Sequence, residues 1–201
     1  MLEAPKPNER MSVLNNTLNL NSLFQRFHGR APQQADAPVC LEYARGLAAG
    51  RTWAETKHAF ASSPQFITRL RSLAATSPEQ ALTLMYNAVL ERDVDDLARK
   101  MYGASLNADR GDINIKNILQ GILTSEEYAR KSVNDLYEEL LGRGAEARGL
   151  EDKLREMREQ GKTLDAVKRD IQDSDEYKQR EARKKREQLE LIVDGSPVVS
   201  I

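Results

Sequence analysis

Three features of this 201-residue sequence predict an all-α fold. Charged residues make up 30% of the chain and aromatic residues only 5%, a mixture typical of helices with solvated faces rather than of a β-sandwich. No alternating strand pattern of any length occurs before residue 189. Signals that start and stop helices recur along the chain and indicate about three degenerate copies of one short-helix repeat. An extended N-terminal arm precedes these copies, and a small C-terminal β-hairpin or strand arm follows them.

The order of these signals divides the chain into five segments. Each repeat unit is expected to contain three or four short helices. The predicted segments are an extended arm (1–20), repeat unit 1 (21–83), repeat unit 2 (84–133), repeat unit 3 with a basic helix end (134–188) and the C-terminal β arm (189–201).

Each unit opens with an aromatic residue that has an apolar partner three positions later, which places both side chains on one face of a helix. The pairs are Phe24 with Phe27, Tyr86 with Val89, and Tyr137 with Leu140. A second aromatic residue closes each unit: Phe66, Tyr128 and Tyr177. We expect all of these side chains to be buried at equivalent positions. Trp53 and Leu164 are also expected to correspond to each other.

Glycine and hydroxyl residues mark where the helices end and begin. Gly29 and Gly142 suit a left-handed stop of the opening helices, and Gly50 and Gly161 suit the stop of the next ones. The predicted helix starts are Thr52 with Glu55 as a capping box, Thr163, Ser63 before Pro64, Ser77 before Pro78, Thr124 with Glu127, and Asp173 with Glu176.

In their order and spacing these motifs resemble a bacterial domain-of-unknown-function family, number 4214. The family pattern is an aromatic residue, two variable residues and Leu-Leu-Gly-Arg, then a Gly-[Arg/Lys]-Thr helix start, then Ser-Pro-Glu-Phe. Unit 3 matches the opening through Leu136, Tyr137, Leu140, Leu141, Gly142 and Arg143, and unit 1 matches the end through Gly50, Thr52, Trp53, Ser63, Pro64 and Phe66. Unit 2 departs from the pattern, because Glu91 replaces the glycine and residues 103–115 do not match.

The resemblance covers about 130 of the 201 residues. The family is distantly similar to the linker domains of phycobilisomes, and it occurs in bacterial surface and secreted proteins and in proteins of phage particles. The resemblance therefore implies scaffolding or attachment, and it implies no catalytic residues.

Charge and cysteine usage exclude several classes of protein. Thirty basic residues nearly cancel thirty-one acidic ones, so no global field favours nucleic acid or an anionic membrane. Cys40 is the only cysteine, which excludes an intrachain disulfide and a thiolate zinc site. The first ten residues carry charges and two prolines without an apolar stretch, so we expect no conventional signal peptide. No stretch approaches the length of a membrane span.

The two histidines, His28 and His58, together with Cys40, are the candidates for a metal or nucleophile site. His28 occupies the slot that holds Leu90 and Leu141 in the other units, which favours a partly buried packing role. We therefore predict no enzyme, no catalytic or metal-binding residue and no cofactor.

Two acidic segments could bind a metal ion, but each has a simpler structural explanation. Residues 107–112 fail as a calcium loop, because the glycine is one place early and Ile118 stands where a bidentate Glu is needed. An exposed turn explains them better, and it also explains the Arg110-Gly111-Asp112 tripeptide. Asp93, Asp95 and Asp96 suit the start of a helix better than a divalent ion.

The best local electrostatic signal is a basic cluster between residues 178 and 186. Its members are Lys178, Arg180, Arg183, Lys184, Lys185 and Arg186. Such a cluster can bind nucleic acid or an acidic partner. No aromatic residue lies within it and acidic residues flank it, so a solvated helix continuing from Tyr177 is the favoured interpretation.

Both ends of the chain are expected to dock onto other protein subunits. Pro5 and Pro7 keep residues 1–20 extended. Residues 189–201 contain seven aliphatic side chains, with a turn at residues 194–197 that predicts strand, turn, strand. The alternatives for this segment are packing on its own domain and docking on a partner. The predicted partner-binding residues are Leu191, Ile192, Val193, Val198, Val199 and Ile201.

The sequence therefore predicts a non-enzymatic structural or adaptor protein that docks into a large assembly. A phage virion or tail is the specific expectation, with the protein made in the host cytoplasm and located in the virion. The alternative is a bacterial surface or secreted module for attachment or glycan binding, exported without a conventional signal peptide. Binding of nucleic acid is a third, less favoured hypothesis.

Overall fold

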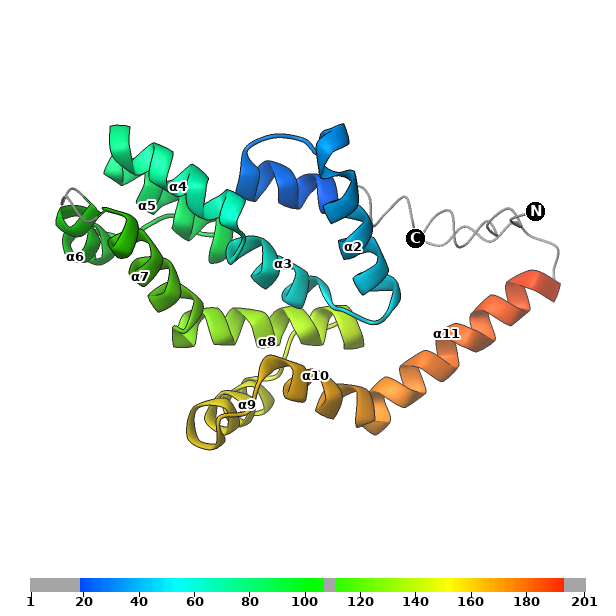
Figure 1. Ribbon diagram of the computed structural model, residues 1–201. Coiled ribbons are helices and arrows are strands. Elements are labelled where there is room, and N and C mark those ends of the chain that lie inside the picture. The colour runs from blue at the N-terminus through cyan, green and yellow to red at the C-terminus, as the bar shows by residue number, and fades with distance from the viewer. Residues whose placement is uncertain (1–18, 107–110, 194–201) are drawn as a thin grey trace.

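The computed structural model describes residues 19–106 and 111–193, and every regular element in these ranges is a helix (Figure 1). The predicted all-α class is confirmed for this part of the chain. None of its helices is both long and apolar enough to cross a bilayer.

In the first unit, the opening helix stops at the predicted glycine, and two of the following helices start at the predicted caps. Residues 19–23 are helical and continue into η1 (Phe24–His28), which is followed by η2 (Gln34–Asp36) and α2 (Ala37–Ala48). Thr52 and Glu55 form the expected capping box at the start of α3 (Trp53–Ala61). Ser63 caps α4 (Pro64–Thr76), with Pro64 at its first position.

The second and third units repeat this order of elements and share one long helix. Unit 2 begins within α5 (Pro78–Val89), contains α6 (Asp96–Leu106) and α7 (Gly111–Leu123), and ends in α8 (Glu126–Leu141). The second half of α8 opens unit 3, which continues with α9 (Ala147–Gln160), α10 (Leu164–Asp173) and α11 (Asp175–Val193). The boundaries drawn between the units stay a prediction.

The side chains predicted to be buried form two apolar clusters that meet at α8. The larger cluster contains η1 and α3 to α7, and it includes the fully buried rings of Phe24, Phe27 and Phe66. The smaller cluster joins Val133, Leu136 and Leu140 of α8 to Val167 and Ile171 of α10. Most of the predicted core residues are buried; the exceptions, Tyr137 and Tyr177, are half-buried. Trp53 and Leu164 correspond as expected, because each is the first residue of a helix capped by a threonine.

Two of the predicted capping boxes are wrong by one residue. The N-cap of α8 is Ser125, whose Oγ accepts a hydrogen bond from the backbone N–H of Tyr128 at 3.1 Å. Ser174 starts α11 in the same way, with the N–H of Tyr177 at 3.2 Å. A serine next to each predicted cap satisfies the free N–H, which leaves the carboxylates of Glu127 and Glu176 available for other partners.

The two predicted arms are wrong where they overlap the described residues. The strand expected at residues 189–193 is helical, because α11 continues to Val193. The cap at Ser174 nucleates this helix, and a run of Glu, Lys, Arg and Gln extends it at low cost, so the two β-branched residues at its end do not stop it. Asn19 and Leu20 are also helical, and Leu20 is buried in the larger cluster. Residues 1–18 and 194–201 lie outside the described ranges.

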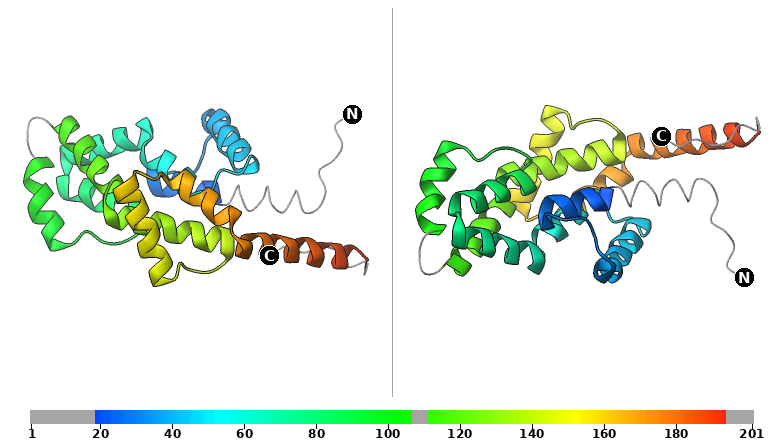
Figure 2. Two further views of the ribbon diagram at one scale, coloured as in Figure 1. Left: turned by 90° about the horizontal axis from the view of Figure 1, so that it is seen from below. Right: turned by 90° about the horizontal axis from the view of Figure 1, so that it is seen from above.

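The molecule is elongated, with α6 at one end and α11 at the other. The first turns of α11 pack on α8 and α10, and the rest of the helix projects away from the body (Figures 1 and 2). The views in Figure 2, from below and from above, agree on this arrangement.

Candidate functional site

The projecting helix is held by a joint that recurs in the first and third units. Arg180 of α11 donates hydrogen bonds to the backbone carbonyls of Glu139 and Leu140 at the end of α8. Its guanidinium lies against Gly142, where an added Cβ would come within 2.8 Å of Nη2. Gly142 also has a φ of 72°, which favours glycine. The joint therefore needs a residue without a side chain at this position.

In unit 1 the same joint is made by Arg69 and Gly29. Arg69 of α4 donates at 3.0 Å to each of the carbonyls of Arg26 and Phe27. Gly29 has a φ of 73°, and an added Cβ would lie 2.7 Å from Cζ of Arg69. The arginine stands three residues after the closing aromatic residue in both units, so the joint is part of the repeat.

Unit 2 replaces this joint by a charge cluster. Glu91 stands in the glycine slot with a φ of 58°, and Lys131 takes the place of the arginine. Lys131 lies 3.0 Å from the Glu91 carboxylate, which also contacts Arg26 and Lys57. Partial burial opposes ionisation of Glu91, but these three cations outweigh it and lower its pKa to about 2. The cluster ties η1, α3 and α8 together.

A second contact anchors the start of α11. Glu176 accepts two hydrogen bonds from Arg143, at 2.6 and 2.7 Å, and Glu127 of α8 is paired in the same way with Arg92. Each arginine also lies over the opening tyrosine of its unit, with Arg92 4.9 Å from the ring centre of Tyr86. A carboxylate in such a bidentate ion pair helps to fix the direction of the helix that carries it.

The predicted basic cluster is divided between the first turns of α11, which pack on the body, and the projecting part of the helix. Lys178 donates to the carbonyl of Asp173 at 2.6 Å, and Arg180 is used in the joint. The four basic residues of the projecting part are Arg183, Lys184, Lys185 and Arg186. Their described ion pairs stay within α11, and the side chain of Arg183 is 73% exposed. This part of the helix therefore presents its positive charge to solvent.

The predicted partner-binding residues are only partly described. The backbone of Leu191, Ile192 and Val193 lies in the last turn of α11. The preceding apolar residue, Leu189, is 63% exposed. Val198, Val199 and Ile201 lie outside the described residues.

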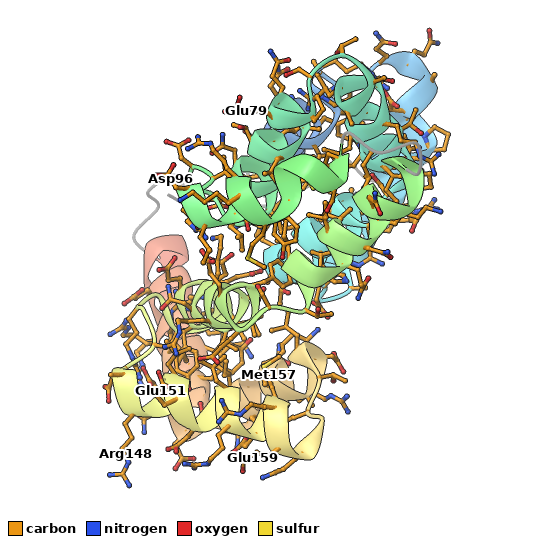
Figure 3. The ribbon with its side chains drawn as sticks, turned by 90° about the vertical axis from the view of Figure 1, so that its left-hand side faces the viewer. Glu79, Asp96, Arg148, Glu151, Met157 and Glu159 are labelled. Atoms are coloured by element: carbon orange, nitrogen blue, oxygen red, sulfur yellow. The ribbon has the colours of Figure 1, made fainter. Side chains whose placement is uncertain are left out.

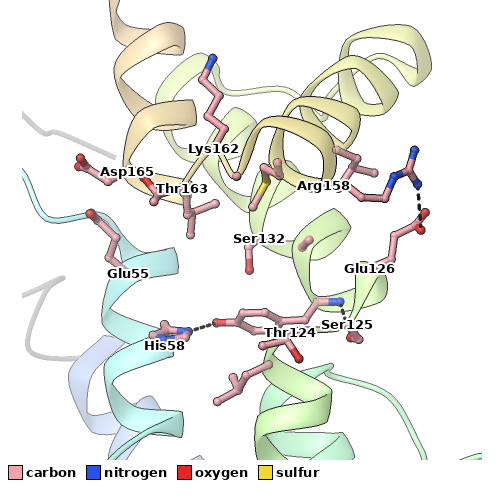
Figure 4. A pocket seen from close by; sticks show the side chains of 17 residues that line it. Glu55, His58, Thr124, Ser125, Glu126, Ser132, Arg158, Lys162, Thr163 and Asp165 are labelled. Carbon is pink, nitrogen blue, oxygen red and sulfur yellow. Dashed lines mark hydrogen bonds and ion pairs between the residues drawn. The ribbon is translucent and has the colours of Figure 1, made fainter.

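A groove opens where α3, α8, α9 and α10 meet, with a volume of about 690 Å³ (Figure 4). Its apolar lining residues include Leu123, Leu154, Met157 and Leu164. The mostly buried Tyr128 also lines it. This mixture of apolar walls and a few polar groups is typical of ligand-binding pockets.

Two polar residues that line the groove, His58 and Tyr128, form a hydrogen bond with each other. His58 of α3 lies with Nδ1 3.1 Å from the Tyr128 hydroxyl, as the dashed line in Figure 4 marks. Burial raises the pKa of Tyr128 to about 12 and lowers the pKa of His58. Both groups are therefore neutral at pH 7, and the pair offers hydrogen bonds without charge.

Charged side chains surround the mouth of the groove. Arg158 is 66% exposed and lies 3.8 Å from Glu126 across the opening (Figure 4). On the other side, Lys168 of α10 binds Glu55 of α3 at 3.1 Å. Burial opposes ionisation of Glu55, but bonds from Thr52 and Lys168 lower its pKa overall. The Lys168–Glu55 pair thus connects unit 3 to unit 1 beside the groove.

The three candidate nucleophile or metal residues lie in separate environments. His28 packs against Phe24 with ring centres 4.9 Å apart, and its Nε2 lies 3.3 Å from Ser63 Oγ, which confirms the partly buried packing role. Cys40 of α2 packs on the larger apolar cluster. His58 lines the groove.

The acidic segments are used in helix starts. The N–H of Ala98 donates to Asp95 at 2.8 Å at the start of α6, which confirms the interpretation of this aspartate cluster. Gly111 and Asp112 are helical in α7, so the turn expected there is wrong at these two residues, and residues 107–110 lie outside the described ranges. Within the described ranges, no three His, Cys, Asp or Glu residues are placed to hold a metal ion.

Sequence reasoning missed the groove and the joints. The groove lies between residues more than 100 positions apart, such as Glu55 and Leu164, and nothing in a local pattern indicates that they meet. The joints could have been found from the sequence. Arg69 and Arg180 each stand three residues after a closing aromatic residue, in the two units that have a glycine at the stop of the opening helix.

In the described residues the fold is all-helical, one kind of Arg–Gly joint occurs twice, and α11 projects from the body. Residues 57–132 match the family model described as Domain of unknown function (DUF4214), so this part of the chain is a DUF4214 domain. The match runs from α3 to the middle of α8 and contains all of α4, α5, α6 and α7. No match was found among the curated proteins or among the solved structures.

Proposed function

We propose that this protein is a non-enzymatic adaptor that docks into a large protein assembly through the projecting part of α11. The observation that carries the proposal is the helix itself: Arg180 bonds to the end of α8, and the helix continues from there to Val193, projecting away from the body (Figures 1 and 2). An isolated helix of this length is marginal in water, and a partner surface would stabilise it.

The rigid attachment of α11 supports the same function. The bonds of Arg180 to α8 and the Arg143–Glu176 pair fix the direction in which the helix leaves the body. A docking element that is held in its bound orientation loses less entropy on binding. A phage virion or tail is the assembly that we favour, since the resemblance to family 4214 implies scaffolding or attachment.

A protein partner is favoured over nucleic acid. The projecting part of α11 contains no aromatic residue, and Glu181 and Glu187 flank its four basic side chains. The helix also combines four basic residues with an exposed leucine, Leu189. A partner with acidic and apolar surface matches both features.

The test compares the tagged full-length chain with a chain that ends at Ala182, each captured from cells or particles that contain the protein. We expect a partner set that the full-length chain retains after nuclease treatment and that the truncated chain loses. Glu159→Lys, an exposed change on α9, serves as the control and should bind normally. Equal capture by the truncated chain would contradict docking through α11, and loss of capture after nuclease treatment would indicate nucleic acid instead.

The groove supports a second candidate function, attachment to a glycan or a similar neutral polar ligand at a bacterial surface. The neutral Tyr128–His58 pair and the hydroxyls of Thr124 and Ser132 line an otherwise apolar space (Figure 4). Titration of a glycan panel into the labelled protein, with Tyr128→Phe as the matched variant, tests this function. Binding that the variant weakens would support it, and no binding by any glycan would contradict it.

A further inference from the structure

Helix α2 is as apolar as a core helix, but it contains no buried residue. Eight of its twelve residues are hydrophobic: Ala37, Val39, Cys40, Leu41, Tyr43, Ala44, Leu47 and Ala48. Helix α5 has the same length and seven hydrophobic residues, and six of its residues are buried. Three side chains of α2, those of Val39, Cys40 and Tyr43, pack on the larger apolar cluster. Only one side of α2 is therefore attached to the body.

The outer side of α2 carries the remaining apolar residues. Leu41, Ala44 and Ala48 follow one another at spacings of three and four, so they lie on one face of the helix. Leu41 is 50% exposed and Ala48 is also exposed, so the described part of the chain does not cover this face. In both views of Figure 2, α2 (the lighter of the blue segments) stands out from the side of the body, apart from α11.

The equivalent helix of unit 3 shows that a solvated face in this repeat is charged. Helix α9 precedes the threonine-capped α10, as α2 precedes the threonine-capped α3. Eight of its fourteen residues are charged, and Figure 3 shows Arg148, Glu151 and Glu159 on its outer side. In α2 the charged residues are Glu42 and Arg45 alone. The outer face of α2 therefore suits contact with another apolar surface better than contact with water.

The two charges of α2 indicate which partner fits this face. Glu42 and Arg45 are exposed, and neither takes part in an ion pair within the described residues. The charged residues beside the helix are engaged, since Asp36 is paired with Arg30 at 2.6 Å and Arg51 lies over a tyrosine ring of α2 at 5.9 Å. In an antiparallel pair of α2 helices, Glu42 of each copy faces Arg45 of the other. A parallel pair would bring like charges together, so the face is complementary to itself about a two-fold axis.

From this self-complementarity we infer that α2 binds α2 of a second copy of this chain in an antiparallel, two-fold contact. Leu41 of each copy packs against Ala44 and Ala48 of the other, and two Glu42–Arg45 pairs form across the contact. A helix of twelve residues is roughly 18 Å long, so the contact is smaller than a standard interface and the dimer is weak.

The inference goes beyond the proposed function and does not depend on it. Because α2 and α11 lie apart on the body, a contact through α2 leaves the projecting part of α11 free (Figures 1 and 2). The dimer would thus present two docking helices, which raises its avidity for an assembly with repeated sites.

Sedimentation velocity of the native full-length chain over a wide concentration range tests the inference. We expect an equilibrium between monomer and dimer, and Leu41→Ser should weaken it at least about tenfold, because Leu41 is the largest exposed apolar side chain of the contact. Leu97→Ser, at an exposed leucine of α6, is the matched control and should dimerise normally. Circular dichroism and melting temperature check that each variant is folded.

Charge reversal tests the antiparallel arrangement. Glu42→Arg or Arg45→Glu alone should weaken the dimer on the order of tenfold, because each change places two pairs of like charges across the contact. An equal mixture of the two variants should regain the native affinity, since each basic position of one chain then faces an acidic position of the other. The double variant that carries both changes in one chain should regain it as well.

Three results would overturn the inference. A native chain that stays monomeric up to about 1 mM would exclude the contact. A dimer that Leu41→Ser leaves unchanged would place the interface elsewhere, and single reversals that neither the mixture nor the double variant restores would exclude the antiparallel pairing. If the native chain is monomeric and Leu41→Ser lowers its melting temperature, a segment of the same chain outside the described residues covers the face. Capture of partners through α11 is measured separately, so this inference and the proposed function can each fail alone.

Discussion

Helices α8 and α11 begin alike and end in different environments. Each starts with a serine cap, and each carries a tyrosine that closes a repeat unit, Tyr128 and Tyr177. In the second half the equivalent positions diverge, since Leu136 of α8 corresponds to Lys185 and Tyr137 corresponds to Arg186. Leu136 is fully buried, whereas Lys185 and Arg186 are exposed.

This difference follows from which helices cover each of the two. The second half of α8 is covered by α9 and α10 of the next unit, so it must be apolar. No fourth unit follows α11 within the described residues, and the same positions carry charge. Terminal repeats commonly replace core positions by polar ones. In this chain the replaced positions of α11 are basic and exposed, and the proposed docking through α11 rests on this feature.

The largest effect expected from this comparison is on folding stability. Leu136→Ala should reduce the free energy of unfolding by about 2–5 kcal/mol, because it leaves a cavity in the smaller apolar cluster. Lys185→Ala at the equivalent position of α11 should change it by less than about 0.5 kcal/mol. Urea denaturation followed by circular dichroism measures both. Similar losses in the two variants would mean that α11 is packed along its whole length.

The joints give the next effect in size. Gly142→Glu should cost about 1–3 kcal/mol, since it adds a side chain at a positive φ and against Arg180. Adding Arg180→Lys to this variant recreates the Glu91–Lys131 arrangement of unit 2 and should recover part of the loss. A double-mutant cycle from urea denaturation gives the coupling energy. Additive losses would show that the two kinds of joint are not interchangeable.

A pH-dependent effect is expected from Glu91. Its pKa is lowered to about 2 in the folded chain, below the ordinary value of 4.5. The stabilisation is therefore present above about pH 4.5 and is lost as the pH falls through the folded pKa. Allowing for solvent screening of this partly exposed group, Glu91→Gln should remove about 1 kcal/mol at pH 7. Unfolding curves between pH 7 and pH 2 should converge for the native chain and the variant; a constant difference would assign the effect to packing.

How far the sequence predicts this structure depends on the range of each interaction. The caps at Thr52 and Ser63 and the stops at Gly29 and Gly142 are set by residues within one turn, and these predictions were confirmed. The strand expected at residues 189–193 was wrong, because the helix that begins at Ser174 propagates through it. The groove was missed since Tyr128, His58 and Leu164 come together only through packing of three units.

The smallest effect is expected from removing the projecting part of α11. A chain that ends at Ala182 keeps the anchor of Glu176 to Arg143 and the bonds of Arg180 to α8. The residues it loses are mostly exposed where their side chains are described, and their described ion pairs stay within the helix. We therefore expect the free energy of unfolding to change by less than about 0.5 kcal/mol. Calorimetry of the two chains measures this change, and a chain shortened to Asp173 provides the contrast, because it loses the whole anchor and should be clearly destabilised.

A large loss on cutting at Ala182 would mean that the projecting residues cover the body. Since their side chains would then serve the fold itself, the docking surface would have to be sought on α2 or in the groove.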